Sequence, residues 1–413
     1  MKFDVVIVGG GLVGATLAAD LGQREFRVAL VEARPTPRLP EIGYDLRVSA
    51  ITRATQRVLE SVGAWSLLPL ERVQPFREMV VWDVKEFGEV HFDSADIGEP
   101  ALGHIVENTA IQRALNTRLE RLDSVEVLRP AQLETVLLEP TRAAAVVAGD
   151  ELSARLVVGA DGARSRVREL AGIEVHEAAY GQRAVVATVT VSLGHGETAW
   201  QRFLPNGPLA FLPLPGDHAS IVWTTTPVHA VALEQMSEDG FVRALEDAYE
   251  GRLGQVKPAG PRAAFDLGTF NARDYVSHRV ALVGDAAHTV HPLAGQGVNL
   301  GILDAAALAE VLDAARSAGR DLGRLHTLRK YQRWRKGHNA LMRTALSGFN
   351  RLFGTSFKPV KDARNAGMRI TNQITPLKRW FMQYASGLSG DLPAAARRAD
   401  YGGAVAHSAR RGV

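Results

Sequence analysis

The chain has 413 residues, 46% hydrophobic and 23% charged, which is the composition of a globular protein with room for two lobes. It contains no cysteine, which excludes disulfide bonds, thiolate nucleophiles, cysteine-ligated metal sites and the flavin disulfide reductases. The net charge is +3, but residues 329–382 hold 13 Lys and Arg and one acid, so that segment carries 13 − 1 = +12 and the remainder 3 − 12 = −9.

The N-terminal stretch lacks the features of a targeting segment. MKFDVVIVGGG enters a strand directly, and its apolar run is too short for a signal peptide. No stretch of the chain approaches the roughly 18 apolar residues that a membrane span needs. We therefore expect a cytoplasmic protein.

The same stretch predicts a dinucleotide-binding βαβ unit. A strand over Phe3–Val8 leads through GGGLVG into a helix over Ala15–Leu21, and a second strand over Arg27–Val31 ends at Glu32. In this pattern the first glycine makes the tight turn, the second admits a pyrophosphate and the third lets the helix pack on the strand. The pattern glycines are Gly9, Gly11 and Gly14. Glu32 would accept hydrogen bonds from a ribose, and an acid here disfavours a 2′-phosphate, which leaves FAD or NAD.

Two later segments favour FAD over NAD. Asp161 lies in GADG after the buried run Leu156–Val158, and Asp285 lies in a GD turn after the strand Val280–Val283. A carboxylate at such a turn can accept hydrogen bonds from the hydroxyls of a flavin side chain. Gly295 and Gly297 then open an alanine-rich helix, and a helix N-terminus entered through glycines offers unpaired N–H groups and a positive dipole end to an anion. An ordinary strand-to-helix turn is the alternative for the GD segment taken alone.

Between these motifs the chain alternates helices and strands. Asp45–Thr52 precedes a helix to about Val62, with Thr52 as a plausible N-cap. Arg47 is either an ordinary surface arginine or a partner of the flavin pyrophosphate. His104–Gln112 leads into a helix to about Leu122. The strands expected next are Val125–Leu128, Gln132–Leu138, Ala143–Ala148 and Leu156–Val158.

From Tyr180 to about Tyr275 the pattern becomes rich in β-strands, which predicts a second lobe of largely antiparallel sheet with one helix over about Ser237–Tyr249. The expected strands are Ala184–Leu193, Trp200–Leu204, Leu209–Leu214 and Ser220–Thr225. Four aromatic residues of this lobe are candidates for the wall of an apolar ligand site, although each could equally belong to the core. They are Trp200, Phe203, Phe211 and Trp223.

These elements predict an α/β fold with three parts. A discontinuous, Rossmann-like FAD-binding lobe spans residues 1–75, 101–179 and 276–325. A β-rich substrate lobe spans 76–100 and 180–275, and a helical, basic C-terminal region spans 326–413. His288 and His291 stand three residues apart, but with no third ligand nearby we expect no metal site. No nucleic-acid partner is expected.

The set GGGLVG, GADGARSRVR and GDAAHTVHPLAGQGVNLG, in this order and spacing, resembles the single-component FAD-dependent aromatic hydroxylases. More narrowly, DLRVSAIT, HIVENTAIQ, WQRF before GPLAFLPL, and HPLAGQGVNLG resemble the ubiquinone-biosynthesis hydroxylases, most of all the branch that acts on the demethoxy-benzoquinol ring (2-octaprenyl-3-methyl-6-methoxy-1,4-benzoquinol). The resemblance covers essentially the whole chain.

The resemblance implies the residues that hold FAD. Those implied for the adenosine half are Gly9, Gly11, Val13, Gly14, Glu32 and Arg34. Those implied for the ribityl-pyrophosphate chain are Arg47, Gln112, Asp161 and Asp285. Those implied along the isoalloxazine are Pro292, Gly295, Gln296, Gly297, Val298 and Asn299, of which Pro292, Gly295 and Gly297 are expected to face the reacting part of the flavin.

The resemblance also implies the reaction. FAD would be reduced by NAD(P)H, which binds transiently, and would react with O₂ to give a C4a-hydroperoxyflavin that hydroxylates a polyprenylated phenol or quinol. No protein general base stands out, so the chemistry belongs to the cofactor. A flavin-dependent reductase of isoprenoid chains and a non-catalytic flavin-binding member of a ubiquinone-biosynthesis complex remain alternatives. The sequence leaves open the ring position, the length of the prenyl tail, the nicotinamide form and whether the chain forms a homo-oligomer.

The basic end has three interpretations. Between Tyr331 and Phe353 an apolar helical face includes Leu341, and nearby arginines and lysines supply positive charge, which is the composition of a helix lying on an anionic membrane. A helix packed on the flavin lobe with a solvated basic face is the second interpretation. Contacts with a partner in a biosynthetic complex are the third. A polyprenyl substrate favours peripheral binding at the inner face of the cytoplasmic membrane.

Overall fold

The computed structural model describes residues 2–83, 89–289, 296–354, 376, 378–379, 382–383 and 386–398. Its first lobe contains a six-stranded sheet in the order β18-β19-β12-β1-β2-β8, parallel except for β18. The strands are β1 (Val5–Val8), β2 (Val28–Val31), β8 (Val125–Leu128), β12 (Leu156–Gly159), β18 (Val276–Ser277) and β19 (Val280–Leu282). Their short runs of valine, alanine and leucine suit strands that are buried on both faces.

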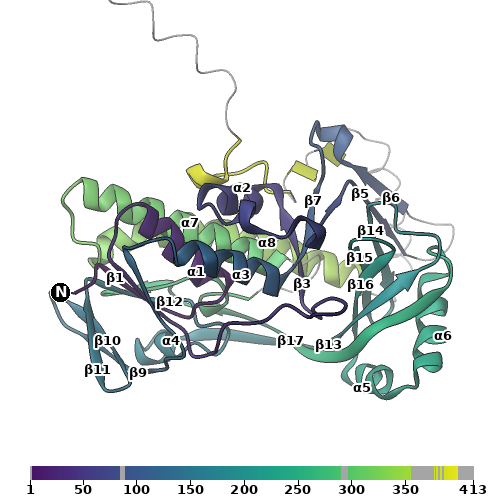
Figure 1. The fold of residues 1–413 in the computed structure, drawn as a ribbon, viewed down its shortest axis with the longest axis horizontal. Coiled ribbons are helices and arrows are strands. Elements are labelled where there is room, and N and C mark those ends of the chain that lie inside the picture. The colour runs from purple at the N-terminus through teal and green to yellow at the C-terminus, as the bar shows by residue number, and fades with distance from the viewer. Residues whose placement is uncertain are drawn as a thin grey trace, which may run out of the picture.

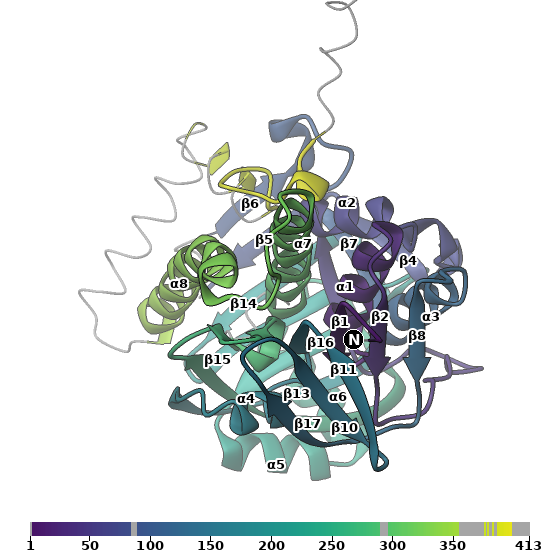
Figure 2. The ribbon, with the colours of Figure 1, turned by 90° about the vertical axis from the view of Figure 1, so that its left-hand side faces the viewer.

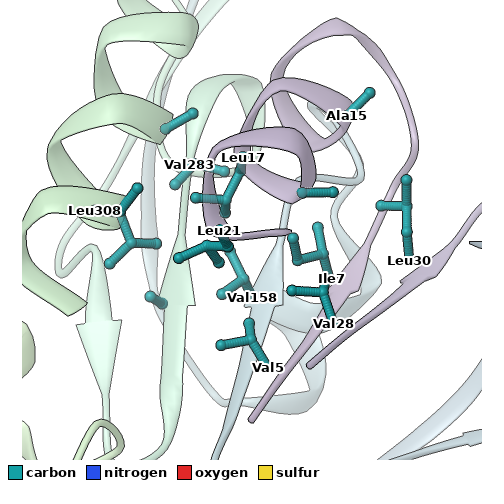
Figure 3. Close-up of a cluster of buried hydrophobic side chains, with 14 of the residues drawn as sticks. Val5, Ile7, Ala15, Leu17, Leu21, Val28, Leu30, Val158, Val283 and Leu308 are labelled. Atoms are coloured by element: carbon teal, nitrogen blue, oxygen red, sulfur yellow. The ribbon is translucent and has the colours of Figure 1, made fainter. Parts of the chain in front are cut away.

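Four helices lie side by side over one face of this sheet, in the order α8, α7, α1, α3 (Figure 2). They are α1 (Leu12–Gln23), α3 (Asn108–Leu119), α7 (Gln296–Ser317) and α8 (Leu325–Gly354). Leu17 and Leu21 of α1 pack onto Ile7 and Val158 of the sheet, and Leu308 of α7 joins the same cluster (Figure 3). A three-stranded sheet packs near the opposite side. It consists of β9 (Leu133–Leu138), β10 (Ala143–Val147) and β11 (Asp150–Ala154), with α4 (Arg166–Leu170) beside β9.

The second lobe is a seven-stranded sheet in the order β17-β13-β16-β15-β14-β5-β6 (Figure 1). Its strands are β5 (Glu78–Trp82), β6 (Glu89–Asp93), β13 (Val175–Val191), β14 (Thr198–Leu204), β15 (Gly207–Pro213), β16 (His218–Thr225) and β17 (Val256–Ala272). All neighbours are antiparallel except β14 and β5. Helices α5 (Pro227–Gln235) and α6 (Glu238–Tyr249) cover one face through a core that includes Phe241 and Tyr249.

A small sheet in the order β3-β7-β4 joins the two lobes. Its strands are β3 (Val48–Thr52), β4 (Val73–Phe76) and β7 (Gly103–Glu107). Ala50 and Ile105 of this sheet share a buried cluster with Leu212 and Leu214 of the large sheet, on the face away from α5 and α6. The remaining elements are α2 (Arg53–Ser61), η1 (Trp65–Leu67), η2 (Leu70–Arg72), η3 (Ser94–Ile97), η4 (Gly284–Ala286) and η6 (Ala394–Ala396).

The fold class expected from the sequence is confirmed, with two omissions in the second lobe. The strand β17 was not predicted because VKPAGPRAAFDLGTFNA contains two prolines and two glycines; as an edge strand, β17 tolerates residues that a central strand would not. Helix α5 was also missed, although Thr226 caps it and Pro227 occupies its first turn. Within the described residues no helix combines the length and the apolar character needed to cross a bilayer.

Candidate active site

The glycine-rich turn between β1 and α1 brings protein backbones into close approach at two positions and leaves the third open. Gly9 has φ +103°, and a Cβ there would lie 2.3 Å from the Ala160 carbonyl oxygen. A Cβ on Gly14 would lie 1.9 Å from the carbonyl oxygen of Gly9. Around Gly11 nothing lies within 4 Å of such an atom, and this residue is the N-cap of α1 without a side-chain cap. The described residues therefore leave the space beside Gly11 unfilled at the N-terminus of α1, where unpaired N–H groups favour an anion such as a pyrophosphate.

Glu32 and Gln112 frame this turn from two elements. The Glu32 carboxylate is buried at the end of β2 and accepts hydrogen bonds from the N–H of Gly10 (2.7 Å) and of Arg34 (2.8 Å). Gln112, on α3, donates its amide to the Gly10 carbonyl (2.7 Å). The Arg34 side chain is largely exposed beside Glu32. The structure thus brings these three predicted residues to the glycine turn.

Asp161 follows β12 and lies against the same turn, since the close contacts of Gly9 are with Ala160 and Asp161. Its Oδ2 accepts hydrogen bonds from the N–H of Arg166 (2.7 Å) and of Val167 (3.1 Å) at the start of α4. Its Oδ1 is buried and has no partner among the described residues. A buried acceptor without a donor is costly, so a hydroxyl group of a ligand would complete this site.

Asp285 lies in η4, directly after β19. Its side chain is accessible, yet the surrounding protein raises its pKa by desolvation, against the opposing effects of His288 and of Arg47. Arg47, from the loop before β3, is exposed and its guanidinium lies 5.2 Å from the centre of the Phe265 ring. The positive charge of Arg47 therefore favours the ionised form of the Asp285 carboxylate.

The start of α7 contacts both the GD turn and β3. Asn299 is buried: its Oδ1 accepts from the N–H of Thr52 (3.0 Å), and its amide donates to the Ala50 carbonyl (2.8 Å). Its amide is therefore used to join α7 to β3. No described atom lies within 4 Å of the position of a Cβ on Gly297, so the described residues leave this side of α7 uncovered. Val298 packs against the core of the first lobe.

Val13 has a packing role in the same corner. A Cβ on Gly301 would lie 2.6 Å from Val13, and one on Gly284 3.2 Å from it, so α1, α7 and the GD turn meet at this side chain. Of the remaining predicted residues, Pro292, Gly295 and His291 lie outside the described residues, as does the side chain of Gln296.

Three of the four residues of the predicted aromatic wall pack in a hydrophobic core, the alternative that the sequence left open. Trp200, Phe211 and Trp223 belong to the core under α5 and α6, where Phe211 lies edge-on to Tyr249 with 5.1 Å between ring centres. Successive residues of a strand point to opposite faces, so these three side chains point away from the first lobe. Phe203 lies on the other face, packed with Val90.

The face of the seven-stranded sheet that is turned toward the first lobe carries smaller side chains at its centre. Ala210 and Val222 pair in register and are partly exposed, although their neighbours along β15 and β16 are buried. Gln201 pairs with Ala210 on the same face; it is 7% exposed, and no hydrogen bond of its amide to the described residues is present. The centre of this face therefore combines small apolar side chains, packed against the cluster of Ala50 and Ile105, with one amide.

Sequence reasoning missed a buried polar cluster behind the GD turn. It considered His288 only as a metal ligand, whereas the structure pairs the His288 ring with Asp304 of α7, 2.6 Å away, next to Arg335 and Asn339 of α8. The described part of the chain holds no group of three His, Asp or Glu suited to a metal ion. A charged residue inside the alanine-rich run LDAAALAEVL was the available signal for Asp304.

Comparisons with known proteins agree with this geometry. Residues 2–341 match the family described as FAD binding domain. The chain is 42% identical to the ubiquinone hydroxylase UbiL of Rhodospirillum rubrum, over 93% of this chain and 89% of that protein. It is 38% identical to the 3-demethoxyubiquinol 3-hydroxylase of Escherichia coli, over 93% and 98%. Among solved structures, p-nitrophenol 4-monooxygenase PnpA of Pseudomonas putida superposes with a TM-score of 0.76 at 21% identity, over 92% of this chain and 97% of that one, a likeness of fold.

Proposed function

Because this chain belongs to the family of FAD-dependent monooxygenases of ubiquinone biosynthesis, we propose that it hydroxylates the ring of a polyprenylated phenol or benzoquinol, with NAD(P)H as reductant and O₂ as co-substrate. The observation that carries the proposal is that Asp161, with its unpartnered Oδ1, lies against the glycine turn at the start of α1, and that the GD turn holding Asp285 meets α1 at Val13. As a monooxygenase, the chain is not expected to act as an isoprenoid-chain reductase or as a flavin-binding scaffold.

The residues present fit FAD. The open N-terminus of α1 at Gly11 would take the pyrophosphate, and Glu32 at the end of β2 would take the adenosine ribose. Asp161, with its orphaned Oδ1, and Asp285 would accept hydrogen bonds from the ribityl hydroxyls. The open turn at Gly297 would face the ring system with its helix dipole. When bound, the cofactor supplies the activation of O₂ for transfer of one oxygen atom.

The protein's own contribution is positioning and exclusion of water. The small face around Ala210 and Val222 would hold the aromatic ring of the substrate, and the amide of Gln201 would hydrogen-bond to a ring oxygen. Phe203 is the one member of the predicted aromatic wall that lies on this face. Trp200, Phe211 and Trp223 would support the sheet from behind.

Within this activity we propose the demethoxy-benzoquinol ring as the substrate. The motifs DLRVSAIT and HPLAGQGVNLG favour this branch, and the Escherichia coli relative is named for the same reaction. Mass spectrometry of quinone intermediates in a deletion strain tests the choice. Accumulation of the demethoxy intermediate is expected, and accumulation of an intermediate lacking a different ring hydroxyl would redirect the proposal to another ring position.

The reaction itself is tested with purified protein, a short-chain benzoquinol analogue and ¹⁸O₂. Oxidation of NAD(P)H should be stimulated by the analogue, and one ¹⁸O atom should enter the product. Oxidation that yields only hydrogen peroxide, whatever quinol is added, would contradict the proposal.

The FAD site is tested by Asp285→Ala. Loss of a charge-assisted hydrogen bond of roughly 1.5–3 kcal/mol should raise the Kd for FAD by about ten- to a hundredfold. Asp266→Ala is the control, because the Asp266 side chain is 91% exposed on the second lobe. Unchanged FAD affinity in the Asp285 variant would remove Asp285 from the site.

We also propose that the outer face of α8 docks onto anionic membrane lipids. The inner face of this helix is buried through Tyr331, Arg335 and Asn339, whereas Arg329, Lys330 and Arg333 are exposed and form no ion pair with the described residues. Leu341, on the same helix, is 58% exposed. Residues of the predicted apolar face beyond Thr344 have side chains outside the described set.

Co-sedimentation with liposomes tests this docking, using anionic and neutral lipid at low and high salt. Binding to anionic vesicles that falls with salt is expected, because each nearby basic residue adds roughly 1 kcal/mol of attraction. Negligible binding under all four conditions would leave contacts with a partner protein as the explanation of the charge.

A further inference from the structure

We propose that a buried cluster of His288, Asp304, Arg335 and Asn339 positions the GD turn for the cofactor, so that α8 controls FAD affinity through Asp304. The inference rests on the proposed function, in which Asp285 of that turn holds the ribityl chain. None of the four residues faces the open site. They are positioning residues, and their effect is expected to pass through Asp285.

The two oxygens of the Asp304 carboxylate hold different parts of the molecule. Oδ2 lies 2.6 Å from His288 Nε2 and accepts a hydrogen bond from the N–H of Gly284 (3.2 Å). Gly284 and His288 flank Asp285 on its two sides. Oδ1 accepts hydrogen bonds from Arg335 Nε (2.8 Å) and from the Asn339 amide (3.0 Å), both on α8. The Asp304 carboxylate therefore holds residues on both sides of Asp285 and links the GD turn to α8.

The cluster is closed on all sides. Asp304 and Arg335 have no exposed surface, and His288 and Asn339 are nearly as buried. Asn339 also lies 2.8 Å from His288 Nε2, and its Oδ1 accepts a hydrogen bond from Arg335 Nη2 (3.1 Å). The ring of Tyr275 stacks on His288, with 5.4 Å between ring centres. A side chain held by this many partners has one available position, which is what a turn carrying a cofactor ligand requires.

The same face of α8 also holds the strands that lead into the turn. The Tyr331 hydroxyl donates to the carbonyl of Leu282 in β19 (2.8 Å). Gln332 Oε1 accepts from the N–H groups of Tyr275 (2.7 Å) and Val276 (3.2 Å) at β18. With Arg335 and Asn339, these residues form a continuous line of contacts from α8 to the GD turn.

Stability alone does not account for a buried ion cluster. Burial raises the pKa of Asp304, but His288 and Arg335 outweigh it and hold this pKa well below its ordinary value, so the carboxylate stays ionised. Apolar side chains of similar size are often as stabilising as a buried ion pair, whereas removing one partner leaves a buried charge without compensation. What the ions provide here is a fixed geometry at Asp285.

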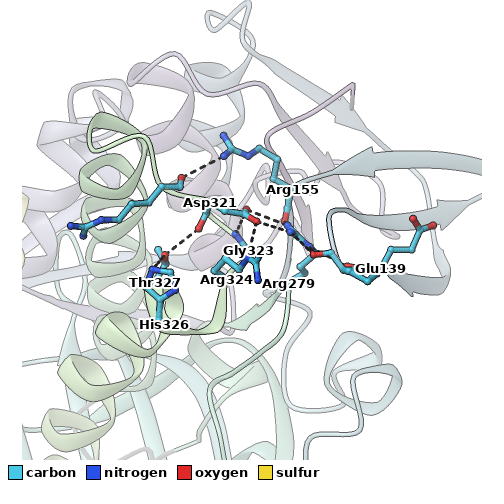
Figure 4. A network of polar contacts seen from close by, with 10 residues as sticks. Glu139, Arg155, Arg279, Asp321, Gly323, Arg324, His326 and Thr327 are labelled. Atoms are coloured by element: carbon cyan, nitrogen blue, oxygen red, sulfur yellow. Dashed lines mark hydrogen bonds and ion pairs between the residues drawn. The ribbon is translucent and has the colours of Figure 1, made fainter.

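The structure offers a matched control at the other end of β19. Arg279 is 1% exposed and pairs with Asp321 (2.6 Å), in the segment between α7 and α8 (Figure 4). Arg279 also donates to the backbone carbonyls of Glu139, Pro140 and Arg155. The Arg279–Asp321 pair also links the segment between α7 and α8 to β19, but neither residue contacts the GD turn. Arg279→Met and Arg335→Met should both destabilise the apoprotein, Arg335→Met the more because it leaves Asp304 fully buried while Asp321 is 31% exposed, but only Arg335→Met should affect the GD turn.

The test measures the Kd for FAD, the melting temperature of the apoprotein and the midpoint potential of bound FAD. Arg335→Met should raise the Kd at least tenfold and shift the potential, whereas Arg279→Met should leave the Kd within twofold and the potential unchanged. Equal changes in Kd for the two variants would overturn the proposal. Should Arg335→Met fail to fold, Asn339→Ala keeps the Asp304–Arg335 pair and should raise the Kd about threefold.

A double-mutant cycle separates this inference from the function on which it rests. If the cluster acts through Asp285, the variant Asp285→Ala/Arg335→Met should bind FAD no more weakly than Asp285→Ala alone. Additive losses would overturn the positioning role while leaving Asp285 in the site. No loss in Asp285→Ala would instead remove the premise that this carboxylate holds FAD.

Discussion

The two faces of the seven-stranded sheet differ in side-chain size and in what covers them. The face under α5 and α6 carries Trp82, Trp200, Phe211 and Trp223 in a continuous buried core. The face toward the cofactor lobe carries Ala210, Val222 and Gln201 at its centre, where Ala210 and Val222 remain partly exposed. Aromatic side chains fill the face under α5 and α6, whereas the centre of the other face carries smaller side chains, which is where we propose that the substrate ring binds.

The two faces should therefore affect different properties of the protein, one its stability and the other its activity. Substitutions on the aromatic face should lower the free energy of unfolding and leave the properties of the folded enzyme unchanged. Substitutions on the small face should change turnover at nearly constant stability. Four measurements test whether the two faces affect stability and activity separately.

The largest effect is expected from Phe211→Ala. Phe211 is 1% exposed, and truncation of a buried phenylalanine costs about 3–5 kcal/mol because a cavity replaces the ring. Denaturant unfolding should show this loss, while the KM of the remaining folded enzyme stays the same. A changed KM at unchanged stability would place Phe211 in the substrate site after all.

The next effect is expected on the small face, from Val222→Phe. Because Val222 is partly exposed in the middle of the sheet, a larger side chain should be accommodated with a change of less than about 1 kcal/mol in unfolding free energy. The added ring would occupy the space for the substrate, and kcat/KM should fall at least tenfold, the equivalent of about 1.4 kcal/mol. FAD affinity serves as the control and should not change. A loss of stability with normal turnover would mean that this face is packed.

The local turns that we propose for the cofactor could be predicted from the sequence, whereas the packing of the second-lobe sheet could not. GxGxxG and the GD turn are local patterns whose geometry follows from a few adjacent residues, and Gly9 and Gly14 are in the close contacts that the pattern implies. The substrate wall depends on which face of each strand is covered by helices. Alternation predicts that Trp200 and Gln201 point in opposite directions, but not which of them meets α6, and α5 was not expected at all.

The cluster around Asp304 shows a second limit of the same kind. Its members come from three segments separated by up to 51 residues, and of the four only Asp304, a charge inside an alanine-rich run, stands out in the sequence. His288 and Asp304 meet only because α7 packs against the GD turn, and Arg335 joins them only because α8 packs against α7. Long-range packing of this kind has no signature in the local pattern.

A smaller effect is expected from Gln201→Leu, which should lower kcat/KM without lowering stability. The Gln201 amide is nearly buried and makes no hydrogen bond to the described residues, so an apolar side chain of similar size should leave stability unchanged or raise it. If the amide orients the substrate ring, kcat/KM should fall about two- to tenfold, since one hydrogen bond contributes about 0.5–1.5 kcal/mol. Normal kcat/KM would show that the amide faces only water.

The smallest effect concerns pH and the small sheet that borders the cofactor side. His104 of β7 lies edge-on to Trp65, with 5.2 Å between ring centres, and burial, assisted by the charge of Arg53, lowers its pKa from 6.5 to about 4. Because the unfolded chain binds this proton more readily, the stability from neutral His104 is present above pH 6.5 and is lost as the pH falls toward 4. The loss should reach about 1 kcal/mol near pH 5.8. Unfolding of the wild type and of His104→Leu, followed from pH 7.5 to 5, should show a shallower pH dependence in the variant. Hydrogen exchange should show that the loss of stability at low pH falls on β3, β7 and β4, with the amides of α5 and α6 unaffected. Equal acid sensitivity of both regions would mean that the two sides of the sheet unfold as one unit.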